Sequence, residues 1–190
     1  MPVGEHLQQT FATVLLKKVV EAVFSGVAEF KGIASFVKCS LQGTARRGDG
    51  FRCVGKCAHS RHLIIENSFV QEPLNLDRLV FELQVDGYRP ILAHPERYFY
   101  YYENLDRYRA LHDAGVEFQI NLLSLAGYYG KGERRIAEKL IDMGLVDFVG
   151  TDLHGRRHVE SIRGYMATRE FRRHRSALEK VIKNGLIPDN

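Results

Sequence analysis

The sequence predicts an α/β fold built on a parallel sheet. Three glycines, Gly87, Gly115 and Gly144, recur roughly thirty residues apart, which is the length of one strand plus one crossover helix. Four residues that can bind metal come where apolar runs end, in the stretches ENSF, AHPERY and TDLH. Because the carboxyl ends of parallel strands meet at one edge of a sheet, we expect these side chains to converge there.

The first strand-helix unit begins with the run LIIE, residues 63–66, whose composition favours a short strand. A helix follows, for which Asn75 is the expected N-cap and Gly87 the C-terminal stop. The spacing of its apolar residues predicts one buried face, made of Leu76, Leu79, Val80 and Leu83.

The same cycle then repeats twice. PILA, residues 90–93, is the next expected strand, and Asn104 precedes a helix from about Leu105 to Ala114. VEFQIN, residues 116–121, is the third strand, and the helix after it ends at Gly144. The apolar side of that third helix carries Ile136, Leu140 and Ile141.

LVDFVGTD, residues 145–152, is the fourth expected strand with its exit loop. SIRGYM and a segment over 168–182 then read as closing helices, the second burying Phe171, Leu178, Val181 and Ile182. Upstream, a helix is expected over about 5–24, followed by a glycine-rich stretch without a clean period. We therefore expect an atypical segment over residues 1–62 and the strand-helix domain over 63–190.

Composition narrows the possible functions. A chain of 190 residues with 45% hydrophobic residues suffices for one packed domain. Its 27 Lys and Arg against 23 Asp and Glu give a mixed surface, which argues against a dedicated nucleic-acid binder. The positive excess gathers over 46–61 and 156–175, and the second stretch adjoins TDLH. We therefore favour a phosphorylated substrate over nucleic acid as the ligand.

The beginning of the chain predicts the cellular location. Lys17, Lys18 and Glu21 interrupt the first amphipathic stretch, so it suits neither a secretory signal nor a membrane span. The cysteines number 3, an odd count that argues against a disulfide framework. We expect a cytoplasmic protein without membrane insertion.

The motif TDLH supplies two candidate metal ligands, Asp152 and His154. Their D-x-H spacing places a carboxylate and an imidazole on the same side of an extended loop, an arrangement suited to a divalent metal. The alternative is that Asp152 only caps the next helix.

Glu66 and His94 complete the candidate ligand set. Pro95 is expected to force His94 into an extended conformation and so to fix the direction of the imidazole. A histidine bonded to a backbone carbonyl is the structural alternative for His94. For Glu66 the alternative is a salt bridge to Arg97 or another basic neighbour, because an acid at the rim of buried strands needs a partner.

Arginines near these motifs are candidates for binding phosphate. Arg97 lies in HPER, and Arg156 or Arg157 follows TDLH. A guanidinium fork matches phosphoryl oxygens and neutralises the charge that develops in the transition state. The tyrosine-rich run over 98–102 is expected mainly to pack, with one or two rings free to line a substrate groove.

An alternative metal site consists of Cys53, Cys57, His59 and His62, whose residue types suit zinc but whose spacing fits zinc knuckles poorly. Asn121 and the stretch SLAGYYG, by contrast, carry no pattern beyond structure.

From about Leu63 to Ile187 the chain resembles the PHP (polymerase and histidinol phosphatase) superfamily, in particular bacterial tyrosine phosphatases found with capsule and exopolysaccharide genes. The matching stretches are IIENSF, FELQVDGYRPILAHPERY, FQINLLSLAGYYG and GLVDFVGTDLHGRRH. The resemblance implies an incomplete or distorted β/α barrel of the PHP type and a cluster of divalent metal, with manganese favoured over iron or zinc. It also implies hydrolysis of phosphotyrosine in a protein such as a bacterial tyrosine kinase.

By that resemblance Glu66, His94, Asp152 and His154 fall on metal-ligand positions, Arg97 on a phosphate-binding position, and Arg157 on an approximate second one. The N-terminal H-x-H pair of these phosphatases has no match in residues 1–60. Because a cluster with about half of its ligands binds metal weakly, a catalytically inactive domain that binds a phosphoprotein or a metal is the alternative function.

Overall fold

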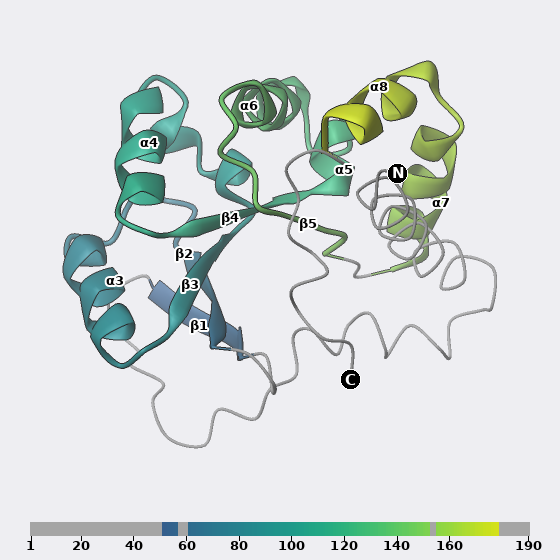
Figure 1. Ribbon diagram of the computed structural model, residues 1–190. Helices are drawn as coiled ribbons and strands as arrows, with labels where there is room; N and C mark the ends of the chain where they lie inside the picture. The colour runs from purple at the N-terminus through teal and green to yellow at the C-terminus, as the bar shows by residue number, and fades with distance from the viewer. Residues whose placement is uncertain (1–50, 57–60, 153–154, 179–190) are drawn as a thin grey trace, which may run out of the picture.

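The structure is a computed structural model that describes residues 51–56 by their backbone and residues 61–152 and 155–178 in full (Figure 1). Its strands form one sheet in the order β1-β2-β3-β4-β5. They are β1 (Phe51–Lys56), β2 (His62–Asn67), β3 (Arg89–Ala93), β4 (Glu117–Asn121) and β5 (Phe148–Gly150). The strands from β2 to β5 are parallel, whereas β1 pairs antiparallel with β2. The predicted α/β fold with a parallel sheet is confirmed.

Helices connect and follow these strands. The crossover helices are α3 (Leu76–Val85), α4 (Leu105–Asp113) and α6 (Lys131–Asp142). Short turns of helix lie at the strand ends, namely η1 (Pro95–Arg97), η2 (Phe99–Tyr101) and α5 (Leu122–Leu125). The described chain ends with α7 (Arg156–Met166) and α8 (Arg169–Leu178). In the described part of the chain no helix combines the length and the apolar character that a membrane span requires.

The strand order explains why the fold resembles part of a barrel. From β2 to β5 each new parallel strand adds to the same edge, so the order never reverses. Right-handed crossovers in one constant direction place all connecting helices on one face of the sheet. Figure 1 shows α3, α4 and α6 on that face. This is the winding of a β/α barrel and not of a doubly wound sheet.

The predicted helix ends are mostly confirmed. Gly87, Gly115 and Gly144 follow α3, α4 and α6 with φ of 79°, 87° and 69°, the left-handed conformation that ends a helix. Asn104 caps α4 by accepting from the Arg107 N–H at 3.3 Å. Asn75 is the N-cap residue of α3, as predicted, but its side chain makes no cap hydrogen bond. A turn made by the backbone precedes the helix instead, because the Leu76 N–H donates to the Pro73 carbonyl.

The sheet has two different faces. One packs against the helices in the main core and carries Leu63, Ile65, Leu92, Phe118 and Ile120. The other face carries a small apolar cluster of Ile64, Ile91, Ala93 and Phe148. Because side chains alternate along a strand, Glu66 lies on the same face as Ile64. Polar groups at the carboxyl end of this second face form the candidate site.

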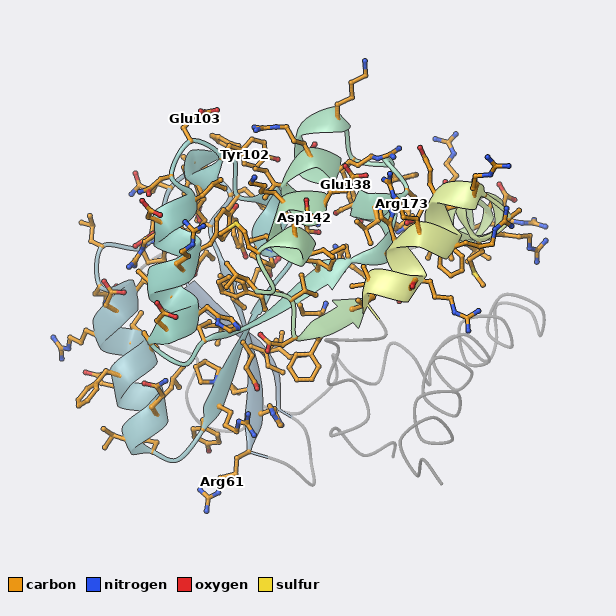
Figure 2. The ribbon with its side chains drawn as sticks, turned by 45° about the horizontal axis from the view of Figure 1, so that its top comes forward. Arg61, Tyr102, Glu103, Glu138, Asp142 and Arg173 are labelled. Atoms are coloured by element: carbon orange, nitrogen blue, oxygen red, sulfur yellow. The ribbon has the colours of Figure 1, made fainter. Side chains whose placement is uncertain are left out.

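The last helix, α8, is joined to α6 by charged groups. Figure 2 shows Glu138 of α6 beside Arg173 of α8, and the carboxylate and guanidinium are 3.6 Å apart. Phe171 and Leu178 of α8 are buried, as predicted. The expected buried residues Val181 and Ile182, and the helix expected over 5–24, lie outside the described residues. The division of the chain at residue 62 stays a prediction.

Candidate active site

Three of the four predicted metal ligands lie at the carboxyl edge of the parallel strands. Glu66 is the penultimate residue of β2, His94 follows β3 directly, and Asp152 comes two residues after β5. Asn121 ends β4 between them. The fourth predicted ligand, His154, lies outside the described residues. The described strands therefore end at one edge of the sheet, as expected, whereas the metal-ligand roles of these residues stay a prediction.

Glu66 and His94 form a direct pair. Glu66 Oε1 lies 2.9 Å from His94 Nε2, and the imidazole is buried. Two ligand atoms that bind one ion at right angles, each at about 2.1 Å, are themselves about 3 Å apart. The pair therefore has the donor types and the spacing that a divalent cation requires. The other ring nitrogen, His94 Nδ1, is buried without a hydrogen-bond partner among the described residues.

Backbone conformation distinguishes two of these positions. His94 and Asp152, with φ of 38° and 45°, are the non-glycine residues with positive φ in the described part of the chain. Such conformations cost about 1–3 kcal/mol each and gather at functional sites. The extended conformation predicted for His94 is wrong. Its N–H completes the ladder to Gln119 and its carbonyl accepts from the Arg97 N–H, so the chain must turn at once from the strand into η1.

Arg97 connects the turn after β3 to the loop after β5. Its Nη1 donates to Asp152 Oδ2 at 3.2 Å. The guanidinium carbon lies 4.2 Å from the ring centre of Tyr129 and 4.9 Å from that of Phe69. Contact with two rings fixes the plane of the guanidinium. This arrangement supports Arg97 as a phosphate-binding residue whose present acidic partner is Asp152.

Asn121 belongs to the site, although the sequence suggested only a structural role. Its side-chain Nδ2 donates to Asp152 Oδ2 at 3.4 Å. Asp152 Oδ2 thus receives hydrogen bonds from both Arg97 and Asn121. These two bonds hold the carboxylate in one orientation at the edge of the sheet.

Glu96 is a buried carboxyl group that sequence reasoning missed. Its Oε1 accepts from the Asn121 N–H at 2.9 Å and from the Ser124 hydroxyl at 2.5 Å. Burial raises the pKa of Glu96 above its ordinary value, against the opposing effect of these hydrogen bonds. Oε2 has no hydrogen-bond partner among the described residues. Glu96 therefore ties η1 to the end of β4 and positions its neighbours, His94 and Arg97.

Arg157, the second phosphate-binding candidate, is exposed in the first turn of α7. Its neighbour His158 contacts the loop that carries Asp152, since His158 Nδ1 lies 3.3 Å from the Asp152 carbonyl oxygen. Within the described residues no three histidine, cysteine or acidic side chains gather as a metal cluster. Because His154 falls outside that part, the predicted four-ligand set stays a prediction.

The alternative zinc site is separate from this one. His62 Nε2 lies 3.2 Å from Glu117 Oε2, at the amino ends of β2 and β4. Arg61, labelled in Figure 2, precedes β2 and marks this end of the sheet, opposite the candidate site. The side chains of Cys53, Cys57 and His59 lie outside the described ones. In the tyrosine-rich run, Tyr98 and Tyr101 are buried, as expected for packing.

Comparison with known proteins identifies the family. Residues 16–168 match the model of a family described as capsular polysaccharide synthesis, CpsB/CapC. The chain belongs to this family. CpsB/CapC membership confirms the resemblance drawn from the motifs, and the match also includes part of the region upstream of Leu63.

Individual relatives agree with the family match. CapC of Staphylococcus aureus is 35% identical over 129 residues, which cover 67% of this chain and 51% of CapC. The tyrosine-protein phosphatase YwqE of Bacillus subtilis is 35% identical over 95 residues, covering 50% of this chain and 37% of YwqE. The chain thus spans about half or less of the curated relatives that it matches.

A solved structure shares the fold. It comes from crystal structures of YwqE from Bacillus subtilis and CpsB from Streptococcus pneumoniae, described as metal-dependent tyrosine phosphatases. The TM-score is 0.51 at 26% identity, over 65% of this chain and 55% of the solved chain. The α/β fold with barrel-type winding is therefore that of a PHP-type phosphatase of the CpsB/CapC family.

Proposed function

We propose that this chain is a metal-dependent protein-tyrosine phosphatase that takes part in controlling capsular or exopolysaccharide biosynthesis. The observation that carries the proposal is the chain of contacts across the carboxyl edge of the sheet. Glu66 pairs with His94, while Arg97 pairs with Asp152. These two pairs meet at Phe69, which stacks on His94 and contacts Arg97. The tyrosine-phosphatase names of the relatives support the reaction.

The proposed metal ligands are Glu66, His94, Asp152 and His154. Carboxylate oxygen and imidazole nitrogen suit manganese, which we favour, and also iron or zinc. The chemistry that such a cation supplies is activation of water and neutralisation of phosphoryl charge. The described part of the chain contributes the Glu66–His94 pair and the Asp152 carboxylate to this set.

The protein side chains would orient the phosphoryl group. Arg97 has a fixed guanidinium plane, so two of its N–H groups can bind two phosphoryl oxygens at once. Its positive charge lowers the energy of the transition state, in which negative charge spreads over the equatorial oxygens. Asn121 keeps its hydrogen bond to the Asp152 carboxylate when the N–H groups of Arg97 bind the substrate. Arg157 at the start of α7 is the proposed second phosphate contact.

The substrate class follows from this chemistry. We infer that it is a tyrosine-phosphorylated protein, such as a bacterial tyrosine kinase, met in the cytoplasm. We propose neither binding of nucleic acid nor insertion into a membrane. The mixed surface charge of the chain argues against a dedicated nucleic-acid binder.

The test is manganese-dependent release of phosphate. The chain is stripped of metal with a chelator, returned to MnCl₂, and given a phosphotyrosine peptide. We expect release that needs manganese and is lost in His94→Ala. His112→Ala on α4 is the matched control, since His112 pairs with Asp147 away from the site and should leave release intact. Equal release by the His94→Ala variant would reject the proposal.

A second function follows from the candidate ligand set. Residues 1–60 contain no H-x-H pair, so the four proposed ligands are about half of the set that the resemblance implies, and such a cluster binds metal weakly. The chain would then be a catalytically inactive domain that binds a phosphoprotein or a single ion. Metal stoichiometry by elemental analysis separates the two functions. Two or three ions per chain support the enzyme, whereas one or none supports the binding domain.

A further inference from the structure

Phe69 is a large apolar side chain that remains 39% exposed beside the candidate site. Its ring stacks on the His94 imidazole, with ring centres 5.4 Å apart and planes inclined by 16°. The Arg97 guanidinium carbon lies 4.9 Å from the same ring. One exposed aromatic ring therefore contacts both a proposed metal ligand and the proposed phosphate-binding arginine.

The segment that carries Phe69 is held firmly. The Asn67 N–H donates to the buried Tyr98 hydroxyl oxygen at 2.9 Å, and the Tyr100 hydroxyl donates to the Ser68 carbonyl at 3.0 Å. The Phe69 ring itself lies 5.6 Å from the Tyr98 ring. These contacts to η2 and to Tyr98, the residue before it, fix the ring before any ligand arrives. A ring that is already fixed loses little conformational entropy when a ligand binds.

A ligand can cover the exposed part of this ring. Removing apolar surface from water is favourable, so an aromatic group of a substrate gains free energy by packing on it. In phosphotyrosine the aromatic ring is joined to phosphorus through a single oxygen. A phosphoryl group bound by Arg97 therefore brings the substrate ring within reach of Phe69. In phosphoserine the same oxygen leads to one methylene group and then to backbone, so no ring is available for stacking.

We propose that Phe69 is the residue that selects aryl over alkyl phosphates, by stacking against the tyrosine ring of the substrate. The inference rests on the proposed phosphatase function and names the feature of the substrate that this site recognises. Arg97 binds the phosphoryl group that both substrate types share, whereas Phe69 contacts the part that differs. Tyr129 packs on the Arg97 guanidinium and keeps it beside Phe69.

The experiment compares two peptides that differ only in carrying phosphotyrosine or phosphoserine. The full chain is assayed with MnCl₂ for kcat/KM on each, and inorganic phosphate is used as an inhibitor. Phe69→Leu should lower the phosphotyrosine to phosphoserine ratio about fivefold, the worth of one aromatic stacking contact. The inhibition constant of phosphate should change much less than this ratio, because Tyr129 still packs on the Arg97 guanidinium. Phe99→Leu, another exposed aromatic at 60% exposure, is the matched control and should leave the ratio intact.

The outcomes separate this inference from the proposed function. An equal loss of kcat/KM on both peptides in Phe69→Leu overturns the inference, because the ring then only supports His94. If neither peptide is hydrolysed, the phosphatase proposal fails, and the ratio of dissociation constants of the fluorescently labelled peptides decides the inference instead. Preferred binding of phosphotyrosine that disappears in Phe69→Leu then supports it. Absence of binding to both peptides overturns both proposals.

Discussion

Arg97 Nη1 and Asp152 Oδ2 lie 3.2 Å apart, although 55 residues separate them in the sequence. Arg97 belongs to η1 after β3, and Asp152 belongs to the loop after β5. Because β4 lies between these strands, the pair spans the carboxyl edge of the sheet. Both side chains are about one quarter exposed, so a ligand can reach them. The ion pair therefore marks where an incoming phosphoryl group would compete for the guanidinium.

Arg97→Lys tests the role of the guanidinium fork. Lysine keeps the positive charge but loses the paired N–H groups and the flat surface that packs on Tyr129. We expect kcat/KM for a phosphotyrosine peptide to fall about 10²–10³-fold, the usual effect of removing a transition-state donor. Steady-state kinetics with manganese present measure this change.

The matched control for Arg97 is Arg109→Lys on α4, where an exposed arginine pairs with Asp106. It should change kcat/KM by less than twofold, since a surface pair contributes little. An Arg97→Lys enzyme within threefold of the wild type would show that Arg97 does not bind the phosphoryl group.

Glu96 provides a test of stability. Alanine at this position leaves the Ser124 hydroxyl and the Asn121 N–H without their buried acceptor. Each of the two unpaired groups costs about 1–3 kcal/mol, so Glu96→Ala should lower the free energy of unfolding by about 2–6 kcal/mol. Glutamine keeps an acceptor oxygen and should be much milder. Urea unfolding followed by circular dichroism compares the three proteins. Equal stability of Glu96→Ala and wild type would show that Glu96 does not hold η1 to the end of β4.

The pH dependence of the same comparison has a definite sign. Burial raises the folded-state pKa of Glu96 above its ordinary value. Its contribution to stability is therefore complete below the unfolded-state pKa and is lost as pH rises through the folded-state pKa. Glu96→Gln cannot ionise, so its stability relative to wild type should increase with pH across that window. A difference that stays constant with pH would contradict the raised pKa.

Local sequence patterns predicted most of the strand-helix units. Gly87, Gly115 and Gly144 were recognisable because each ends a helix in a conformation that glycine adopts without strain. The strand β1 was not predicted, because its pairing with β2 is antiparallel and contains an irregularity between Cys53 and Gly55. Such an irregularity breaks the alternation that identifies a strand.

Parts of the site depend on contacts between distant segments and could not be predicted locally. Glu96 meets Asn121 and Ser124, which are 25 and 28 residues away. Nothing in HPER indicates which of its side chains turns into the core. The left-handed conformation of His94 likewise follows from a hydrogen bond to β4, which overrides the preference imposed by Pro95. The candidate residues at the strand ends could be predicted from the sequence, whereas the residues that position them could not.

His174 should make the docking of α8 sensitive to pH. Burial lowers its pKa below the ordinary value, and the groups around it are Tyr165, Glu138 and Arg173. The neutral form is therefore favoured in the folded state. Its contribution to stability is present above the unfolded-state pKa of about 6.5 and is lost as pH falls through the folded-state value. Thermal unfolding between pH 7.5 and about pH 5 should show this decrease.

The variant His174→Phe removes the titrating group but keeps a ring next to Tyr165. We expect its melting temperature to depend less on pH in that window than that of the wild type. His112→Phe on α4 is the control, because it leaves His174 in place and should retain the wild-type slope. An unchanged slope in His174→Phe would assign the pH dependence to other groups.

Gly150 and Gln119 should be energetically coupled. Gly150 ends β5, and a Cβ added there would overlap the side-chain amide of Gln119 on the neighbouring strand β4. Gly150→Ala should destabilise the fold by about 1 kcal/mol or more, because the amide must move. Gln119→Ala removes the obstacle, so the double variant should regain most of that loss and give a coupling energy of at least about 0.5 kcal/mol. Urea unfolding of the wild type, both single variants and the double variant measures the coupling. Strictly additive effects would mean that the Gln119 side chain does not lie over Gly150. The close pairing of β4 with β5, which positions the loop that carries Asp152, would then need another cause.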